Sequence, residues 1–380
     1  MLSQQYPILT HVESHIKPLL MDVLSTDKIG VCHGSVELHS VSSSCGKVEG
    51  DRFRLLIPYA RQNLAWNVFF DSQYPEMGPD FIFNDNSFLV DTDINTLSVK
   101  VPSLTEWNPN DKHALLNVLI ELLSCYKQHQ MQLLQKQDKL QLECNMLMTS
   151  TEVKPEDVEM ILLPFGSKPT EARFVISLSV DVSQLEARTY KSESDAAMLL
   201  IIFSGTDWNR IIAHIFFSKS LEEALGGPRA LNLPPLPPNK FLIDYIPEVK
   251  KCITDKINSI NQSLIKRREY ISAILAVQFP SVQEWDSVKY SYITMVLSDQ
   301  EDFHVMVKIE LPAGFPNEKP IILLNSLYHM EGPHSAYSEV FEDFPYKVNW
   351  DSFFKVKKLL LCIKHAIKSF KQNTVKNYCS

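Results

Sequence analysis

A strict alternation of apolar and polar positions occurs twice in this chain, 241 residues apart. The apolar positions are Leu64, Trp66, Val68 and Phe70 in the first stretch and Val305, Val307, Ile309 and Leu311 in the second. Alternation with a period of two is typical of a strand with one buried face. The preceding strands show the same pattern, at Phe53, Leu55 and Ile57 and at Ile293, Met295 and Leu297. We therefore predict two equivalent pairs of antiparallel strands.

The same succession of signals follows each alternating stretch. An aromatic residue and two spaced prolines come first, and a tryptophan then precedes an amphipathic helical pattern. These residues are Tyr74, Pro75, Pro79 and Trp107 in the first copy, and Phe315, Pro316, Pro320 and Trp350 in the second. The succession indicates an internal repeat, and we interpret the eight residues as signatures of its fold.

Helices are predicted on both sides of each copy. Residues 7–24 read as a helix that Pro18 kinks or breaks. The helix after the first tryptophan is expected to begin at Pro109, because proline suits the first helical position. The helix after the second tryptophan has apolar residues at 356, 360, 363, 367 and 370. Each unit thus reads as a helix, antiparallel strands, a proline-rich turn, a long irregular stretch, tryptophan and a helix.

The region between the two copies contains three further strand candidates, at residues 174–180, 197–203 and 210–217. We interpret it as a degenerate third copy of the strand set, and the alternative is a plain linker sheet. A proline-rich run follows at Pro234, Pro235, Pro237 and Pro238. It is either a stiff loop, which we favour, or a polyproline II segment that docks to an SH3-type groove.

Together these patterns predict an α+β fold of tandem modules, in which antiparallel meander sheets pack on helices. The expected domains are residues 1–148, a degenerate middle module at 149–245, and residues 246–380. Long helices at 111–148 and 241–278 are expected to join them.

Composition narrows the classes of function. The net charge is −8 and the pI about 5.8, which argues against a general nucleic-acid binder because phosphate contacts need a basic face. No apolar run reaches the roughly 18 residues of a membrane span, and the first residues lack the apolar core of a signal peptide. We therefore expect a cytoplasmic and nuclear protein. The scattered cysteines read as reduced thiols, at positions 32, 45, 125, 144, 252, 362 and 379.

The order of elements resembles the ubiquitin-conjugating (E2) fold and its inactive UEV and RWD variants. Proline lacks a hydrogen-bond donor and restrains the residue before it, so the two prolines would end the strand ladder and force an extended crossing. The aromatic residue before the first proline is expected to pack into the core beneath that crossing. This interpretation makes the proline turns fold signatures rather than binding sites.

An active conjugating enzyme places a cysteine between this turn and the tryptophan, after a His-Pro-Asn. Residues 84–106 contain neither cysteine nor histidine, and residues 325–349 contain His329 and His334 but no cysteine. The nearest thiols, Cys125 and Cys362, fall on the apolar faces of the following helices, where packing is the simpler role. Zinc-protease, nucleophile-elbow and P-loop motifs are also missing from the sequence. We predict no enzymatic activity, no metal and no cofactor.

Two basic stretches are candidate partner-binding sites. Lys266, Arg267 and Arg268 lie in a predicted helix, and Lys357 and Lys358 belong to a lysine-rich face of the last helix. That face also includes Lys355, Lys364, Lys368 and Lys371. A solvated surface is the simpler interpretation of both stretches, and docking of an acidic partner is the alternative.

Three longer strings resemble one family over nearly the whole chain. They are DRFRLLIPYA…LAWNVFFDSQYPEMGPDFIF…WNP, EEALGGPRAL followed by FLIDYIPEV, and KRREYISAIL. They look like the BRE family of UEV-domain subunits, found in the BRISC deubiquitinating complex and its nuclear sister assembly. The resemblance implies a scaffold without catalytic residues. Its expected partners are a JAMM metalloprotease subunit, an Abraxas-type MPN-like pseudo-enzyme and a von Willebrand A-type adaptor.

The resemblance also implies a biological setting. The assembly is expected to cleave ubiquitin chains linked through lysine sixty-three, with roles in DNA double-strand-break repair, checkpoint and mitotic control, receptor deubiquitination and anti-apoptotic signalling. Direct contact with ubiquitin is a further expectation from the fold. Two alternatives stay open: a conjugating enzyme that uses an unconventional cysteine such as Cys125 or Cys362, and an endosomal-sorting adaptor with a UEV domain.

Overall fold

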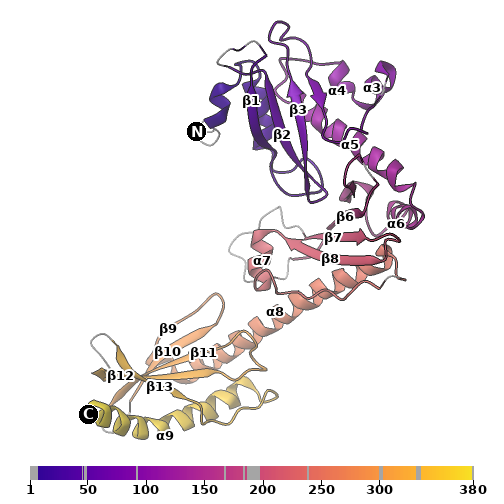
Figure 1. The fold of residues 1–380 in the computed structure, drawn as a ribbon. Coiled ribbons are helices and arrows are strands. Elements are labelled where there is room, and N and C mark those ends of the chain that lie inside the picture. Colours follow the sequence, from indigo (N-terminus) through magenta and orange to yellow (C-terminus); the bar gives the residue numbers. More distant parts are fainter. Residues whose placement is uncertain are drawn as a thin grey trace. The chain divides into compact units, whose positions relative to one another are not determined.

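The computed structural model describes residues 7–44, 46, 49–90, 93–166, 168–182, 185, 197–237, 239–298, 303–330 and 335–378. The chain divides into two compact units, Met1–Val180 with Ser192–Ile253, and Asp181–Lys191 with Thr254–Ser380. Three antiparallel sheets and their helices make up the described part of the chain (Figure 1). The predicted α+β class is confirmed.

The first sheet is an antiparallel meander in the first unit. Its strands, in sheet order, are β1 (Glu37–Ser42), β2 (Arg52–Tyr59), β3 (Gln62–Phe69) and β4 (Asp80–Ile82). The predicted alternation is confirmed, because every second residue of β2 and β3 is buried. The buried residues are Phe53, Leu55, Ile57, Tyr59, Leu64, Trp66 and Val68. They form one core with the apolar residues of helices α2 and α5.

The helices of the first unit differ from the prediction in their boundaries. They are η1 (Pro7–His11), α2 (Lys17–Ser25), α3 (Ile94–Lys100), α4 (Pro102–Thr105), α5 (Ala114–Leu134) and α6 (Asp138–Met148). The helix predicted over residues 7–24 is divided, as expected, into η1 and α2, and the division lies just before Pro18. Pro18 occupies the first turn of α2, where the missing N–H group has no intrahelical partner to lose.

The expected helix start at Pro109 is wrong. The backbone N–H groups of Asn110 and His113 are bonded to the side chains of Asn108 and Asp111, at 3.1 and 2.9 Å. These local bonds favour turns over helix, so α5 begins only at Ala114. The single helix expected over 111–148 is interrupted between α5 and α6.

The middle sheet belongs to the same compact unit. Its strands are β5 (Val158–Leu163), β6 (Glu171–Leu178), β7 (Ala197–Ser204) and β8 (Arg210–Phe217), and helices η2 (Pro155–Asp157) and α7 (Lys219–Leu225) flank them. The three strand candidates correspond to β6, β7 and β8, whereas β5 was not predicted. Nearly every residue of β5 is buried, so it lacks the alternation by which a strand is recognised.

The second unit holds the five-stranded sheet. Helix α8 (Leu242–Gln278) and η3 (Phe279–Ser281) precede it, and α9 (Ser352–Tyr378) follows it. The strands, in sheet order, are β13 (Ala336–Phe341), β12 (Ile321–Met330), β11 (His304–Glu310), β10 (Tyr292–Ser298) and β9 (Val282–Trp285). The long helix predicted over 241–278 is confirmed as α8. Apolar residues of α8 and α9 pack on this sheet in one core.

The two copies agree in their central strands and differ after the proline turn. The offset of 241 residues relates β3 to β11, and it also relates the first residue of β4, Asp80, to the first residue of β12, Ile321. The irregular stretch expected after the turn is wrong in the second copy. There β12 extends over ten residues and β13 pairs with it, whereas β4 has only three residues.

Candidate functional site

The two proline turns place their aromatic residues differently. Phe315 is 2% exposed and packs edge-on against Tyr270, with ring centroids 5.3 Å apart, as predicted for this position. Tyr74 is 56% exposed, so its predicted packing beneath the crossing is wrong. In the first copy Phe70 is buried instead, and its ring lies 6.0 Å from Phe53 and 5.9 Å from Trp107. Its counterpart in the second copy is the smaller Leu311.

The remaining signature residues are two pairs of prolines and two tryptophans. The second proline of each turn lies where the chain re-enters the sheet. Pro79 and Pro320 are buried and directly precede β4 and β12, while Pro75 is exposed and Pro316 half-buried. Trp107 packs against the first core. Trp350 is half-buried, and its ring meets that of Phe354 edge-on at 5.0 Å.

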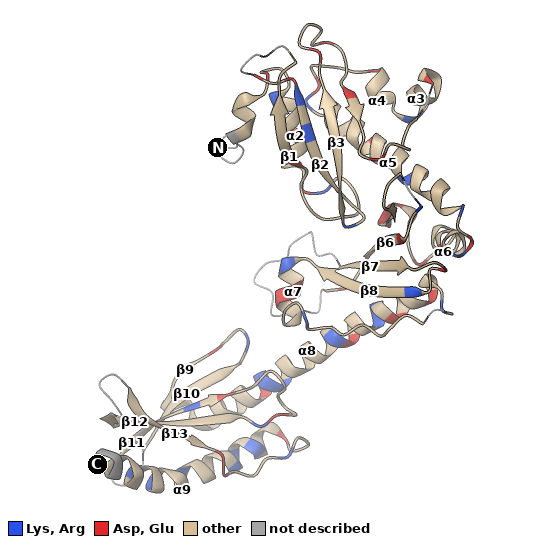
Figure 2. Cartoon of the chain, in the orientation of Figure 1, with Lys and Arg blue, Asp and Glu red and all other residues tan. Residues whose placement is uncertain are grey.

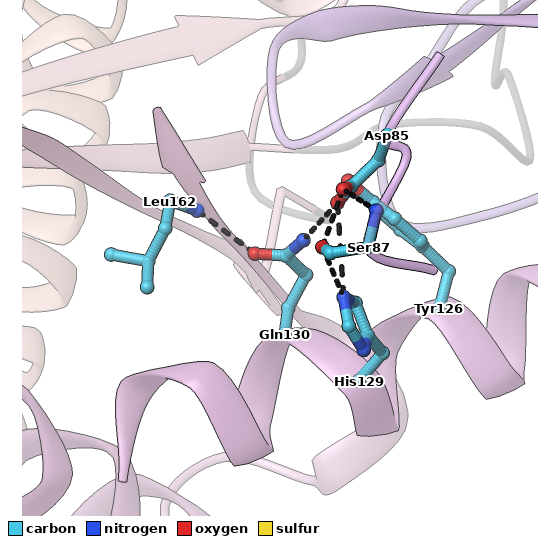
Figure 3. Close-up of polar contacts among 6 residues, drawn as sticks. All are labelled: Asp85, Ser87, Tyr126, His129, Gln130 and Leu162. Atoms are coloured by element: carbon cyan, nitrogen blue, oxygen red, sulfur yellow. Dashed lines mark hydrogen bonds and ion pairs between the residues drawn. The ribbon is translucent and has the colours of Figure 1, made fainter. Parts of the chain in front are cut away.

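A buried polar cluster holds the start of the crossing segment (residues 84–106), where the resemblance to conjugating enzymes led us to look for a cysteine. Asp85 lies just after β4 and is 2% exposed. Its carboxylate accepts hydrogen bonds from Ser87, through the backbone N–H at 3.0 Å and the hydroxyl at 2.6 Å. Tyr126 Oη and Gln130 Nε2 donate to it from α5, at 3.2 and 3.3 Å. Figure 3 shows these side chains converging on Asp85.

The spacing of the α5 residues explains this convergence. Tyr126, His129 and Gln130 lie three and four positions apart, which places them on one face of the helix. Burial raises the pKa of Tyr126 and the carboxylate of Asp85 raises it further, so the phenol stays protonated and remains a donor. The cluster therefore holds the crossing segment to α5.

The cluster contains serine, histidine and aspartate but lacks the arrangement of a catalytic triad. Ser87 Oγ lies 3.1 Å from His129 Nε2, and Asp85 Oδ2 lies 3.8 Å from the same nitrogen. A triad needs the carboxylate on one ring nitrogen and the serine on the other. Here the serine hydroxyl donates to the carboxylate itself. Burial lowers the pKa of His129, although Asp85 opposes this shift. The arrangement serves anchoring rather than nucleophilic chemistry.

Gln130 extends the cluster to the middle sheet. The Gln130 side chain is fully buried, and its Oε1 accepts a hydrogen bond from the backbone N–H of Leu162 in β5 at 3.0 Å. One amide therefore connects the crossing segment to a strand of the next sheet (Figure 3).

Glu159 of β5 makes a second connection between the two sheets of the first unit. Its carboxylate is buried and accepts from the backbone N–H of Val31 at 2.6 Å and from that of Ala60 at 2.8 Å. Ala60 lies in the tight turn between β2 and β3. The carboxylate thus satisfies two donors of the first module from the middle sheet. Burial and the charge of Glu159 raise the pKa of the adjacent Cys32 to about 12, so this thiol is unreactive.

The other described thiols fit packing roles. Cys125 is buried, its Sγ lies 3.6 Å from the carbonyl oxygen of Lys100, and burial raises its pKa. Cys144 contacts Met160 and its pKa is raised in the same way. Cys362 is half-buried in α9. Cys45, Cys379, His334 and Pro238 lie outside the described residues.

The described residues contain neither a metal-binding group of side chains nor a membrane-spanning helix. Within the described ranges, no three His, Cys, Asp or Glu side chains are grouped so that they could hold a metal ion. None of the helices described is both long enough and apolar enough to cross a bilayer. The half-buried His329 has its backbone N–H bonded to Ser326 Oγ at 3.0 Å.

Two of the basic residues expected on solvated faces are packed instead. Arg267 is half-buried and donates to the carbonyl oxygen of Pro312 in the proline turn at 2.8 Å. Lys355 is buried, donates to the carbonyl oxygen of Val348 at 2.8 Å and lies 5.0 Å from the ring centroid of Tyr346. Their long aliphatic stems cross apolar surface while the charged heads reach carbonyl oxygens. For these two residues, the prediction of a solvated face is wrong.

The other basic residues of the two candidate stretches are exposed. Lys266 pairs with Glu269 at 2.8 Å, and Arg268 is exposed on the same helix. Lys357 and Lys358 are exposed on α9. Burial lowers the pKa of Lys355 and the charge of Lys266 lowers it further. Figure 2 shows basic residues on both α8 and α9.

Sequence reasoning missed the buried polar residues Asp85, Gln130 and Glu159. Only Glu159 has a sequence signal, since it is the one charged residue in the otherwise apolar strand VEMILL. A charge inside such a run needs a partner, because an isolated buried carboxylate is unstable. Asp85 and Gln130 lie in segments of ordinary polar composition.

Comparison with known proteins gives consistent results. A family model described as brain and reproductive organ-expressed protein (BRE) matches residues 10–330. A Danio rerio protein named "BRISC and BRCA1-A complex member 2" is 30% identical over 384 residues, which covers 97% of this chain and 97% of that protein. A Branchiostoma floridae protein of the same name is 30% identical over 383 residues, covering 98% of this chain and 99% of that protein. With matches across nearly its whole length, the chain belongs to the BRE family.

Proposed function

We propose that this chain is a non-catalytic subunit of deubiquitinating assemblies of the BRISC and BRCA1-A type. The relatives are named as members of these two complexes and not as enzymes. One observation on this chain itself supports the proposal. The crossing segment of the first module contains no cysteine, and its buried Asp85 is used to fasten the segment to α5.

The thiols of the helices that follow the two proline turns also support a non-catalytic role. Cys125 is buried, and its raised pKa disfavours the thiolate that a conjugating reaction needs. Cys362 lies within α9, packed against the core of the second unit. What each module retains is a folded surface on which other proteins can dock.

The proposed partners follow from the family. They are a JAMM metalloprotease that cleaves chains linked through lysine sixty-three, an Abraxas-type pseudo-enzyme and a von Willebrand A-type adaptor. We place the chain in both the cytoplasm and the nucleus, with the nuclear form acting in DNA double-strand-break repair and checkpoint control. We also propose weak contact between the modules and ubiquitin.

Reconstitution tests this function. The protease, the pseudo-enzyme and the adaptor are co-expressed with and without this chain, and the products are separated by size-exclusion chromatography. We expect the adaptor to join the protease core only when the chain is present. Cleavage of chains linked through lysine sixty-three should need the protease subunit's metal site and no thiol of this chain. A complete assembly formed without the chain would contradict the proposal.

A further inference from the structure

Helix α9 has a second apolar stripe on the face opposite the core. Its inward residues are buried in the second unit's core: Val356, Leu359, Leu360, Ile363, Ile367 and Phe370. On the other face, Phe354 is 43% exposed and Leu361 is 54% exposed. Val375, also exposed, continues the same spacing of seven. Positions seven apart lie almost two full turns along a helix and share one side.

Lysines border this stripe on both sides. Lys357, Lys358, Lys364 and Lys368 are exposed, and Lys368 occupies the one position of the seven-residue series that is not apolar. Among the described residues, none of these four lysines forms an ion pair. The sequence of α9 contains seven lysines and no aspartate or glutamate, although the whole chain has a net charge of −8 (Figure 2).

The start of the stripe is held in place by aromatic contacts. Lys358 Nζ lies 5.5 Å from the ring centroid of Phe354, and Lys357 Nζ lies 4.7 Å from that of Phe353. The Phe354 ring also meets Trp350 edge-on. Each exposed phenylalanine therefore has a cation beside it, which places apolar and positively charged surface within the reach of a single partner.

The outward series Phe354, Leu361, Lys368 and Val375 is apolar at three of its four positions. A helix face exposed only to water would be expected to carry polar residues there. A second copy of this chain cannot cover the stripe through the same face, because the lysines of the two copies would oppose each other. The complementary surface is an apolar stripe flanked by carboxylates, as in the pairing rules of coiled coils.

We propose that the outward face of α9 is a docking site for an amphipathic helix of another protein, with an apolar stripe along its centre and Asp or Glu along its margins. The series from Phe354 to Val375 fits a partner helix about 32 Å long at 1.5 Å per residue. Leu361 lies at the centre of the contact, and the four lysines select the acidic margins. This surface is distinct from the crossing segments and does not depend on the proposed function.

Fluorescence anisotropy with the purified full-length chain tests the proposal. The probe is a synthetic helical peptide of about 24 residues, with leucine at a and d and glutamate at e and g. We expect saturable binding that weakens as salt is raised. A variant with Lys357, Lys358, Lys364 and Lys368 changed to Glu should bind roughly tenfold more weakly. Leu361→Asp should weaken binding by a similar factor.

Controls separate docking from general electrostatics. Changing the exposed lysines 112, 219, 251 and 289 to Glu alters the net charge equally and should leave binding unchanged. A peptide with lysine at e and g should not bind. Equal losses in the two lysine variants would overturn the proposal. So would tighter binding to phosphatidylserine vesicles or to an RNA oligomer than to the acidic peptide.

A photo-crosslinking amino acid at position 361 of the chain expressed in cells identifies the native occupant. The crosslinked peptide, sequenced by mass spectrometry, should be helical in pattern, amphipathic and net acidic. A basic segment, a lipid, a nucleic acid or no crosslinked species at all would overturn the proposal.

Discussion

Replacement of Asp85 by alanine should destabilise the first unit strongly. The side chain accepts hydrogen bonds from Tyr126, Gln130 and Ser87. Without it, the buried Tyr126 hydroxyl and Gln130 amide lose an acceptor, and each unsatisfied buried group costs about 1–3 kcal/mol. Because the release of a buried charge offsets part of this cost, we expect the free energy of unfolding to fall by about 2–4 kcal/mol.

Urea unfolding followed by circular dichroism measures this change, and hydrogen exchange with mass spectrometry locates it. Protection should fall in two places, the crossing segment after β4 and the strand β5 that Gln130 reaches. The second unit should keep its protection, because it contains none of these contacts. Asp80→Ala, at an exposed position in β4, is the matched control and should stay within about 0.5 kcal/mol of the parent.

The result that refutes this reasoning is specific. If Asp85→Ala unfolds within about 0.5 kcal/mol of the parent and β5 keeps its protection, the polar cluster does not hold the crossing segment. A loss confined to the crossing segment would show that Gln130 does not couple it to the middle sheet.

Three further predictions concern buried groups. Glu159→Ala removes the acceptor of two buried backbone donors and should cost about 2–4 kcal/mol in urea unfolding. The exposed control Glu156→Ala should cost about 0.5 kcal/mol or less. Equal costs would contradict the connection that Glu159 makes between the two sheets of the first unit. Glu143 is buried in α6 and accepts a hydrogen bond from the backbone N–H of Leu242. Burial raises the pKa of Glu143 above the usual 4.5, so the stability linked to this group is present below about pH 4.5 and is lost as pH rises through the folded pKa. Glu143→Gln keeps an acceptor without a charge and should therefore gain stability relative to the parent between about pH 4.5 and pH 7.5, and an unchanged difference across this range would speak against it. Phe315→Ala should cost about 3–5 kcal/mol by thermal or urea unfolding and Tyr74→Ala about 0.5 kcal/mol or less, and the reverse order would refute the packing of the two turns.

The sequence predicts the central strands well because they are half-buried. Residues on β2, β3 and β11 alternate between core and surface, and the alternation is visible in the sequence. Strand β5 is buried nearly throughout, so periodicity does not identify it. Strand β13 has no fully buried residue and lies at the sheet edge, which leaves an equally weak signal.

The errors at single residues have local physical causes. Tyr74 and Phe315 occupy equivalent sequence positions, but in the first copy it is Phe70 that is buried, packed against Phe53 and Trp107, while Tyr74 is exposed. The helix predicted from Pro109 begins only at Ala114, because the side-chain bonds of Asn108 and Asp111 favour turns before it. Which of these local contacts forms depends on the folded structure, so the sequence pattern alone does not predict it.

Of the candidate site in the crossing segment, the sequence predicted only the lack of a cysteine. The absence of cysteine from residues 84–106 is a fact of the sequence. The polar cluster around Asp85 is not visible in the sequence, because Asp85 contacts Tyr126 and Gln130, which lie more than forty positions away along the chain. Likewise, nothing in the sequence separates the buried Lys355 from the exposed Lys357, since both belong to one lysine-rich helix.

The proposal that this chain has lost conjugating chemistry is tested most directly by a charging reaction. The purified chain is incubated with ubiquitin-activating enzyme, ATP and ubiquitin, and the products are separated on a non-reducing gel beside an active conjugating enzyme. We predict no ubiquitin adduct on this chain under conditions that fully charge the control. A thioester band that disappears with reductant, and that Cys125→Ala or Cys362→Ala abolishes, would contradict the account.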